Sequence, residues 1–357
     1  MKKKLLSVVI LMVYLAVCVT FGQNNTDLLK NLNGIVGYDN IEVHFIDVGQ
    51  GDCILVKNGD EAMLIDAGDD SKGTKIQLYL KKQGITKLDY FLITHPDSDH
   101  CGGADVILYK FDCDKVLMTD FEKDTTSYKA VLDTLELKNY KVSNPKVGDR
   151  FKLGKSTFTI LGPLLENPSS NNNSIVIRLE NGKTSFLFSA DAEKEEEDAI
   201  AANSLNIESD VLKIGHHGSS SSTSDAYLEK INPKYCVISC GAENDYGHPH
   251  AEVLDRLRKN GCRVFRTDEQ GSIIAYSDGK RITFNCSPST TWKSGENVKI
   301  FSDLTIYSYI ANKNTHKFHK PECEGVKDMK EKNKWYFDGD RESLIEEGYK
   351  PCQRCKP

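Results

Sequence analysis

The chain has 357 residues, which is enough for one large domain and a second, small one. Hydrophobic residues make up 39% and charged residues 27% of the sequence, a composition that excludes a disordered chain and is typical of a globular protein. The formal net charge is −6, which does not favour diffuse binding to a phosphate backbone. Any nucleic-acid substrate would therefore need a local basic strip or a bound metal ion.

The first residues have the pattern of a secretion signal. Three lysines at positions 2–4 precede an apolar run over 5–19, and a polar segment follows. The run is shorter than the ~20 residues that cross a bilayer, so we expect residues 1–23 to be a cleaved signal peptide and the protein to be secreted or extracytoplasmic. A lipid anchor at Cys18 and an uncleaved anchor are the alternatives. No later stretch is apolar enough to cross a membrane, so the mature chain is expected to contain no membrane span.

Short strands and helices alternate from about residue 40 onward. Apolar runs separated by Gly-containing turns predict strands at 41–47, 53–57 and 62–66, and a helix follows at 71–84. The next predicted strand, 88–94, ends on His95. The remaining elements begin with a strand at 115–119, a helix at 125–138 and a strand at 157–161.

A second set of elements begins with two strands joined by Asn181-Gly182, a strong hairpin signal. The elements expected in this set are strands at 175–179, 184–189, 210–214, 235–239, 263–266, 272–276 and 281–285, and helices at 193–202, 223–231 and 250–260. Two sets of similar composition predict two sheets packed face to face with helices outside. The fold class is therefore α/β (α+β), in a domain over 39–287.

Four side chains that commonly bind metals lie within six positions at the end of the 88–94 strand. They are His95, Asp97, Asp99 and His100. A loop at a strand end can turn such groups toward one point, and reactive groups are often placed there. The alternative is a solvated turn in which Asp99 caps the next helix.

Other predicted strands also end close to groups of this kind. Asp191 follows the strand at 184–189, His216 and His217 follow the strand at 210–214, and His248 and His250 come after the strand at 235–239. Each histidine alone is better explained by a helix cap or a hydrogen-bonded turn. Together, they indicate one rim where these strands end.

Here the sequence resembles the metallo-β-lactamase superfamily, and more narrowly the soluble hydrolase domain of ComEC-type competence proteins, which take part in DNA uptake. The motifs that carry the resemblance are 45–52 (FIDVGQGD), 64–68 (LIDAG), 94–103, 171–174, 189–191, 213–219, 246–250 and 265–271. They occur in family order over roughly residues 40–285. The resemblance implies an αββα sandwich whose metal site lies along one sheet edge.

The resemblance also implies roles for the clustered side chains. His95 and Asp97 would serve one metal position, Asp99 and His100 the other, and Asp191 would bridge them. The implied set of metal ligands is His95, Asp97, Asp99, His100, Asp191 and one of His216 and His217, with His217 preferred. Asp97 or Asp99 would orient the attacking water and accept its proton, and His248 and His250 would face the substrate.

Two departures from the superfamily pattern affect the choice of metal. Asp97 stands where the superfamily usually has a histidine, a substitution that the ComEC-like branch shares. Residues 171–174 stand where the third histidine motif belongs. The site is therefore rich in oxygen, and Mn²⁺ rivals Zn²⁺ because carboxylates suit harder ions. One or two ions are expected.

The last fifty residues form a second predicted module. His319 with Cys323, and Cys352 with Cys355, give two close pairs of ligands, which a closed tetrahedral zinc site requires. The region resembles the small zinc-binding domain of Ada-type DNA alkylation-repair regulators. A linker at 288–302 and a structural-zinc domain at 303–357 follow from this reading. A disulfide-bonded tail is the alternative.

We expect an exported metal-dependent hydrolase, and a phosphodiesterase or nuclease acting on DNA is the first hypothesis. The alternatives are a hydrolase of another ester, lactone or amide and a non-catalytic binding protein, because this fold hosts many chemistries. A partner at the cell surface or in the uptake machinery would be needed for a part in DNA uptake. The acidic domain should repel a polyanion such as DNA unless basic residues such as Lys213 converge near the site.

Overall fold

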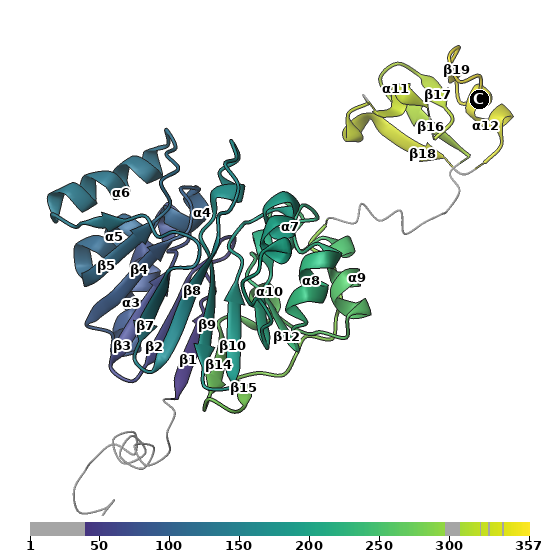
Figure 1. Ribbon diagram of the computed structural model, residues 1–357. Coiled ribbons are helices and arrows are strands. Elements are labelled where there is room, and N and C mark those ends of the chain that lie inside the picture. Colours follow the sequence, from purple (N-terminus) through teal and green to yellow (C-terminus); the bar gives the residue numbers. More distant parts are fainter. Residues whose placement is uncertain (1–39, 297–307, 322, 328, 338) are drawn as a thin grey trace, which may run out of the picture. The chain divides into compact units, whose positions relative to one another are not determined.

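The computed structural model describes residues 40–296 and 308–357, apart from 322, 328 and 338 (Figure 1). The predicted signal peptide and Cys18 lie outside the described residues. The chain divides into two compact units, Met1–Glu296 and Asn297–Pro357. None of the helices that the structure describes is both long and apolar enough to span a bilayer.

The first unit is built on two sheets. The eight-stranded sheet has, in spatial order, β15 (Ile282–Phe284), β14 (Ile273–Ser277), β1 (Ile41–Phe45), β2 (Ile54–Asn58), β3 (Glu61–Ile65), β4 (Lys87–Ile93), β5 (Asp112–Met118) and β6 (Val142–Ser143). The seven-stranded sheet has β13 (Arg263–Arg266), β12 (Tyr235–Ile238), β11 (Val211–Lys213), β10 (Thr184–Phe188), β9 (Val176–Asn181), β8 (Ser156–Gly162) and β7 (Arg150–Leu153). Strands β9 and β10 form the predicted antiparallel hairpin around Asn181.

Helices cover the outer face of each sheet (Figure 1). Those that follow strands of the first sheet are η1 (Asp70–Lys72), α3 (Gly73–Lys82), α4 (Ser98–Cys101), α5 (Ala104–Lys110) and α6 (Thr126–Leu137). Those around the second sheet are η2 (Asn171–Asn173), α7 (Lys194–Ala202), η3 (Gly215–Gly218), α8 (Asp225–Ile231), α9 (Ala251–Lys259) and α10 (Thr267–Gln270).

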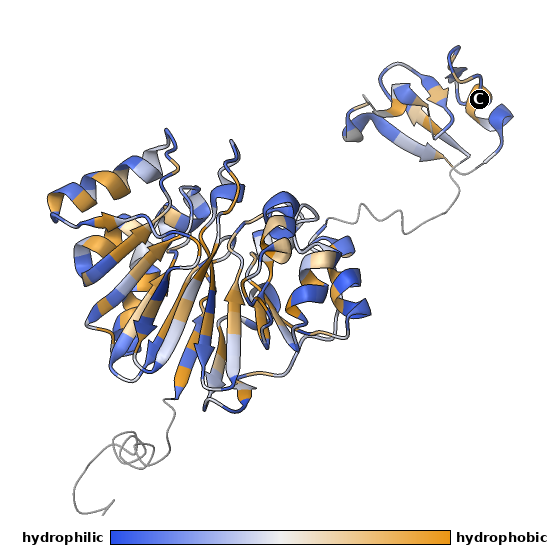
Figure 2. Cartoon of the chain, in the orientation of Figure 1, coloured by the Kyte–Doolittle hydropathy of each residue, from blue (hydrophilic) through white to orange (hydrophobic). Residues whose placement is uncertain are grey.

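Three apolar layers hold these elements together. One joins α3, α5 and α6 to the first sheet, the second lies between the sheets, and the third joins α7, α8 and α9 to the second sheet. Strand β4 is apolar on both faces from residue 90 onward: Tyr90 and Leu92 face the middle layer, whereas Phe91 and Ile93 face the helices. In Figure 2, orange apolar segments alternate with blue polar ones along the strands of the first unit. The architecture is the expected αββα sandwich.

Strand direction brings the candidate site residues to one sheet edge. Strands β10, β11, β12 and β13 are parallel neighbours, so their carboxyl ends meet at the same edge. Asp191 follows β10, His217 follows β11, and the 241–250 loop follows β12. In the other sheet, β4 is parallel to β3 and β5 and ends two residues before His95.

Residues 287–296, which we call the strap, run along the first unit. Ser289 N–H donates to the Val264 carbonyl at 2.7 Å, the Arg266 guanidinium donates to the Lys293 carbonyl, and Gly295 N–H donates to the Pro249 carbonyl at 2.9 Å. The predicted linker at 288–302 therefore begins with nine residues that belong to the first unit. Residues 297–302 of that linker lie outside the described part.

The second unit contains a four-stranded sheet in the order β18 (Lys334–Phe337), β16 (Tyr309–Asn312), β17 (Lys317–His319) and β19 (Lys350–Pro351). Its helices are α11 (Glu324–Lys327), η4 (Glu331–Asn333) and α12 (Arg341–Glu346). Ala311, Phe318 and Leu344 are fully buried at its centre. This core is small, as expected for a domain that needs a further stabilising element.

Candidate metal centre

The floor of the site is Asp66, a fully buried carboxylate directly after β3. Its Oδ1 accepts from the Thr94 backbone N–H at 2.8 Å, and its Oδ2 accepts from the Thr94 hydroxyl at 2.7 Å. The same Oδ2 lies 2.8 Å from His100 Nδ1, so this nitrogen carries the proton and donates. Asp66 thus supports the 95–100 loop from beneath and fixes the His100 ring.

The Nε2 atoms of two buried histidines face each other. His217 Nδ1 lies 3.0 Å from the Ser239 carbonyl, which can only accept, so Nδ1 donates and Nε2 is the nitrogen left to bind a proton or a metal. Burial lowers the pKa of both imidazoles, but Asp191 and the neighbouring carboxylates outweigh it and hold both pKa values well above the usual range. His217 Nε2 and His100 Nε2 are 3.2 Å apart. Two imidazole lone pairs at this distance require a proton or a cation between them. A divalent metal ion fits this requirement.

Two carboxylates surround the same point. Asp191 Oδ1 is 3.1 Å from His100 Nε2, and its Oδ2 is 3.4 Å from His217 Nε2. Asp99 Oδ2 is 3.2 Å from His217 Nε2. Burial raises the pKa of Asp191, but the His100 and His217 imidazoles outweigh it and hold this pKa well below the usual range. Asp191 is therefore ionised and offers the negative charge that a cation needs.

His95 offers a further nitrogen to this centre. Its Nδ1 lies 3.1 Å from the Thr94 hydroxyl and 3.3 Å from the Ser174 hydroxyl. Its Nε2 is buried, has no hydrogen-bond partner and lies 4.0 Å from Asp191 Oδ2. A buried polar atom without a partner is costly, and a metal ion would satisfy it. Residue 174 belongs to the segment that stands where the superfamily has a histidine.

Asp52 joins the cluster, although no role was predicted for it. Asp52, His100, Asp191 and His217 each offer one ligand atom, and these atoms all lie within 4.8 Å of one another. Asp52 Oδ1 is buried without a hydrogen-bond partner and lies 3.4 Å from His217 Nδ1. The signal that could have found Asp52 is its place at the end of a Gly-Gln-Gly turn directly after a strand.

The expectation that Lys213 offers positive charge to a substrate is wrong. Its side chain is fully buried, and its Nζ donates to Asp52 Oδ2 at 2.8 Å and to the Ile214 carbonyl at 2.9 Å. Burial raises the pKa of Asp52, but the Lys213 ammonium more than compensates and lowers it to about 2. Lys213 therefore holds a buried carboxylate in place and does not reach solvent.

Left-handed backbone is concentrated around the cluster. Asp66, Ala190, His216 and His217 have φ angles of 57°, 46°, 47° and 56°. Such conformations are uncommon for residues other than glycine and cost roughly 1–3 kcal/mol each. Their grouping at one set of strand ends indicates that the surrounding fold enforces the positions of these side chains.

Two predicted ligands lie at the edge of the cluster. Asp97 Oδ1 accepts from Lys123 Nζ at 2.7 Å and from the Ser170 hydroxyl. Burial raises the pKa of Asp97, but the effects of His95 and Lys123 are larger and lower this pKa below its usual value. Asp97 is therefore ionised. His216 is partly exposed, and its Nε2 is 3.7 Å from Asp191 Oδ2. The ligand roles of all these residues stay predictions.

The 241–250 loop forms one wall of the site. The His248 ring centre lies 5.5 Å from that of His216 and 6.2 Å from that of His217. Burial and the neighbouring histidines lower the pKa of His248 to about 3, so it is neutral at neutral pH. His250 is held by the backbone instead: its Nδ1 accepts from Ser220 N–H at 2.8 Å, and its Nε2 is 3.2 Å from the Tyr246 carbonyl.

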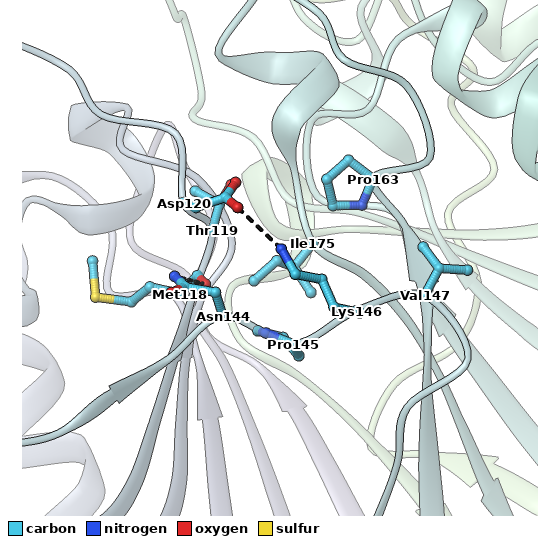
Figure 3. Close-up of a pocket in the computed structure, with 9 residues that line it drawn as sticks. All are labelled: Met118, Thr119, Asp120, Asn144, Pro145, Lys146, Val147, Pro163 and Ile175. Atoms are coloured by element: carbon cyan, nitrogen blue, oxygen red, sulfur yellow. Dashed lines mark hydrogen bonds and ion pairs between the residues drawn. The ribbon is translucent and has the colours of Figure 1, made fainter.

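A small cavity lies beside the site, at the ends of β5 and β6 (Figure 3). Its lining includes the Lys146–Asp120 ion pair, with 3.0 Å between Nζ and Oδ2, and Ile175, whose N–H donates to the Thr94 carbonyl. Its volume of about 50 Å³ is enough for a few water molecules but not for a substrate.

The second unit has a separate cluster of ligand atoms. His319, Cys323, Cys352 and Cys355 each offer one atom, and these lie within 4.8 Å of one another. All cysteines of the described residues are free thiols, so the alternative of a disulfide in this tail finds no support there. Three sulfurs and one imidazole nitrogen suit tetrahedral zinc.

The fold and the cluster define a metal-dependent hydrolase. A family model described as the metallo-beta-lactamase superfamily matches residues 46–242, and the chain belongs to this superfamily. A structure of the metallo-beta-lactamase fold protein YhfI from Bacillus subtilis covers 67% of this chain and all of its own, with 15% identity and a TM-score of 0.46.

Among curated proteins, the chain is similar to ComE operon protein 3 and Recombination protein 2. ComE operon protein 3 of Bacillus subtilis is 33% identical over 266 residues, which are 69% of this chain and 34% of that protein. Recombination protein 2 of Haemophilus influenzae is 34% identical over 239 residues, 65% of this chain and 28% of that protein. The chain thus spans about a third of the length of these relatives.

Proposed function

We propose that the chain is an exported phosphodiesterase that cleaves DNA, with one or two divalent ions, Zn²⁺ or Mn²⁺, in the first unit. The observation that carries the proposal is the facing pair of imidazole nitrogens on His100 and His217, surrounded by the carboxylates of Asp191 and Asp99. An oxygen-rich site of this kind suits Mn²⁺ as well as Zn²⁺. The resemblance to ComEC-type competence proteins and the name Recombination protein 2 of one relative support DNA as the substrate.

The ions would supply a Lewis acid that polarises a phosphoryl oxygen and makes water reactive near neutral pH. His95, His100, His217 and Asp191 would hold them. Asp99 is partly exposed at the mouth of the cluster, and the His217 contact keeps it ionised despite its burial. Its carboxylate is therefore placed to orient a water molecule and accept a proton from it.

His248 can donate a hydrogen bond to the substrate. Gln50 Nε2 is an amide nitrogen that only donates, and it lies 3.5 Å from His248 Nδ1. In the neutral ring the proton therefore sits on Nε2. Such a donor stabilises negative charge that develops on an oxygen without adding a cation to the site.

Charge at the rim also bears on the substrate class. Lys123 reaches the site and keeps 37% of its side chain exposed while it pairs with Asp97. At physiological salt screening reaches only about 8 Å, so a cation at the rim acts on a bound phosphate more than the distant acidic surface does. We expect activity to weaken as salt rises.

Export and a cell-envelope partner belong to the same proposal. Export rests on the basic and apolar pattern of residues 1–23. The relatives are about three times longer than the matched region, so a role in DNA uptake would require further components. In the second unit, we propose a structural zinc ion held by His319, Cys323, Cys352 and Cys355, in a domain resembling that of Ada-type regulators.

The test is metal analysis together with hydrolysis of single-stranded DNA, double-stranded DNA and bis(p-nitrophenyl) phosphate, each with Mn²⁺ or Zn²⁺. We expect Mn²⁺-stimulated cleavage that salt weakens. Asp99→Ala and His100→Ala should abolish hydrolysis and lower the metal content while the domain stays folded. Asp114→Ala, which alters an exposed carboxylate on β5, is the matched control.

Three results would contradict the proposal. Unchanged turnover in the Asp99 or His100 variant, with metal still bound, would overturn the assigned centre. Clear turnover of a lactone or a β-lactam with no cleavage of any phosphodiester would replace the substrate class. A protein that binds metal but hydrolyses none of the panel would favour the non-catalytic alternative.

A further inference from the structure

An exposed tyrosine lies at the mouth of the metal centre. Tyr246, in the loop between β12 and α9, has 65% of its surface exposed. Its ring stacks on that of His248, with centres 5.6 Å apart and planes inclined by 22°. The next ring is that of His217, 6.2 Å from His248. A row of aromatic rings therefore leads from solvent to the buried cluster.

The loop that presents this ring is held rigidly. Asn244 Oδ1 accepts from the backbone N–H groups of Tyr246 and His248 at 3.1 and 3.0 Å. Asn244 Nδ2 donates to the carbonyls of Gly241 and His248 at 2.8 and 2.6 Å. One side chain thus fixes the turn on both sides of Tyr246, and the loop keeps its shape without the Tyr246 ring packing into the core.

The strap fixes the far end of the same loop. Gly295 lies so close to the loop that a Cβ atom on this residue would be 1.9 Å from the His248 carbonyl oxygen. The Glu296 carboxylate accepts a hydrogen bond from Ala251 N–H at 3.0 Å. The Tyr246 ring is therefore held in the open beside the candidate active site, where its free face is available to a ligand.

We propose that Tyr246 and His248 form a base-stacking subsite, which binds an unpaired nucleobase next to the phosphodiester at the metal centre. This inference rests on the proposed phosphodiesterase function and names its substrate class as single-stranded nucleic acid. Aromatic side chains stack on any base because every base has a π-face, so the subsite would not depend on sequence. In a duplex both faces of a base are covered, so an unpaired strand is preferred.

The geometry fits a nucleotide at this position. The Tyr246 and His217 ring centres cannot be farther apart than the sum of two distances between ring centres, which are 5.6 Å from Tyr246 to His248 and 6.2 Å from His248 to His217. A base stacked on Tyr246 therefore leaves its own phosphate free to reach the cluster. Lys123, which pairs with Asp97 at the edge of the cluster, keeps 37% of its side chain exposed and can meet a further phosphate.

The experiment measures binding of two labelled ten-residue strands to the full-length protein by fluorescence anisotropy. One strand is oligothymidine, and the other is an abasic strand with the same number of phosphates. Binding is measured without added Mn²⁺, and the strands are checked for cleavage afterwards. We expect the wild type to bind oligothymidine roughly 5- to 150-fold more tightly, the range that stacking of one base supplies.

Variants assign this difference to the ring. Tyr246→Ala should bring the two affinities to within about twofold, and Tyr246→Phe should keep the difference because it keeps the stacking surface. Tyr109→Ala, which removes a tyrosine that is 54% exposed on α5, is the matched control and should keep it too. The thermal midpoints of all three variants should stay near that of the wild type, because both rings are exposed.

Each outcome decides between the proposals. Equal affinity of the wild type for both strands, or an unchanged preference in Tyr246→Ala, would overturn the subsite. Equal loss of both affinities in Tyr246→Ala would also overturn it, because the ring would then act on the backbone or the loop. Cleavage of phosphodiesters without base preference would support the phosphodiesterase function and reject the base-stacking subsite. A Tyr246-dependent base preference without any cleavage would support the subsite and reject the phosphodiesterase function.

Discussion

Replacing Lys213 by methionine should lower the free energy of unfolding of the first unit by far more than the loss of one hydrogen bond would. Lys213 Nζ and Asp52 Oδ2 are 2.8 Å apart, and the two side chains are 0% and 2% exposed. Methionine fills a similar volume but removes the ammonium, so the Asp52 carboxylate stays buried without its counterion. Breaking such a buried pair costs about 3–5 kcal/mol.

The pKa of Asp52 gives an independent measure of the same interaction. It is lowered from 3.8 to about 2, because the Lys213 ammonium outweighs the effect of burial. A shift of this size corresponds to about 2 kcal/mol. This contribution is complete above the unfolded pKa near 4 and is lost as pH falls through about 2. In Lys213→Met, the ammonium no longer offsets the effect of burial on Asp52, so the variant should be most impaired at neutral pH.

The assay is urea denaturation followed by circular dichroism, on metal-depleted protein at pH 7 and at pH 3. We expect the free energy of unfolding to fall by about 3–5 kcal/mol at pH 7 and by less at pH 3. Lys87→Met is the control: Lys87 Nζ and Asp114 Oδ2 are also 2.8 Å apart, but both side chains are about half exposed. That variant should lose at most about 1 kcal/mol.

The reasoning would be refuted by a loss below about 1 kcal/mol in Lys213→Met, since that value is typical of an exposed pair. Equal losses in the two lysine variants would refute it as well. The double variant Lys213→Met with Asp52→Leu removes both charges and should recover most of the lost stability, because no unpaired charge is then buried. Failure of this recovery would indicate that packing around Lys213, and not charge, determines the effect.

Three further outcomes are expected. Gly295→Ala places a Cβ 1.9 Å from the His248 carbonyl oxygen, so hydrolysis should fall roughly 10- to 100-fold with little change in the unfolding midpoint; wild-type rates would show that the strap does not position the loop. Cys352→Ser should lower zinc content by one ion per chain and leave hydrolysis of a small phosphodiester intact, and unchanged zinc by elemental analysis would exclude the tail site. Ala190→Gly relieves a φ of 46° and should raise the free energy of unfolding by up to about 1 kcal/mol; a clear decrease in urea denaturation would contradict this.

The sequence predicted those parts of the fold that local pattern determines. The strand at 88–94 and the hairpin around Asn181 appear as β4 and as β9 with β10, within a residue or two at their ends. Strand β7 (Arg150–Leu153) was not predicted, because its alternating charged residues resemble a surface loop. Pairing with β8 across a short turn makes it a strand, and this contact is not visible in its composition.

The candidate site was predictable where ligands cluster in sequence and not where the contacts are distant. The four groups from His95 to His100 are adjacent, so their loop was evident. Asp52 and Lys213 are separated by more than 150 residues, and only the packing of the two sheets brings their side chains to 2.8 Å. Lysine was expected at the surface because its burial is rare without a partner, and that partner was not identifiable from sequence.

The residues with left-handed backbone conformation around the metal centre can also indicate how related proteins with this fold have evolved. Ala190, His216 and His217 hold conformations that glycine or asparagine would adopt at lower cost. Once selection for turnover is lost, nothing offsets that cost, and substitutions to glycine or asparagine at these positions become favourable. Related proteins that keep the αββα sandwich but have lost hydrolytic activity should therefore have glycine or asparagine at these three positions. These substitutions should appear before changes in the hydrophobic layers.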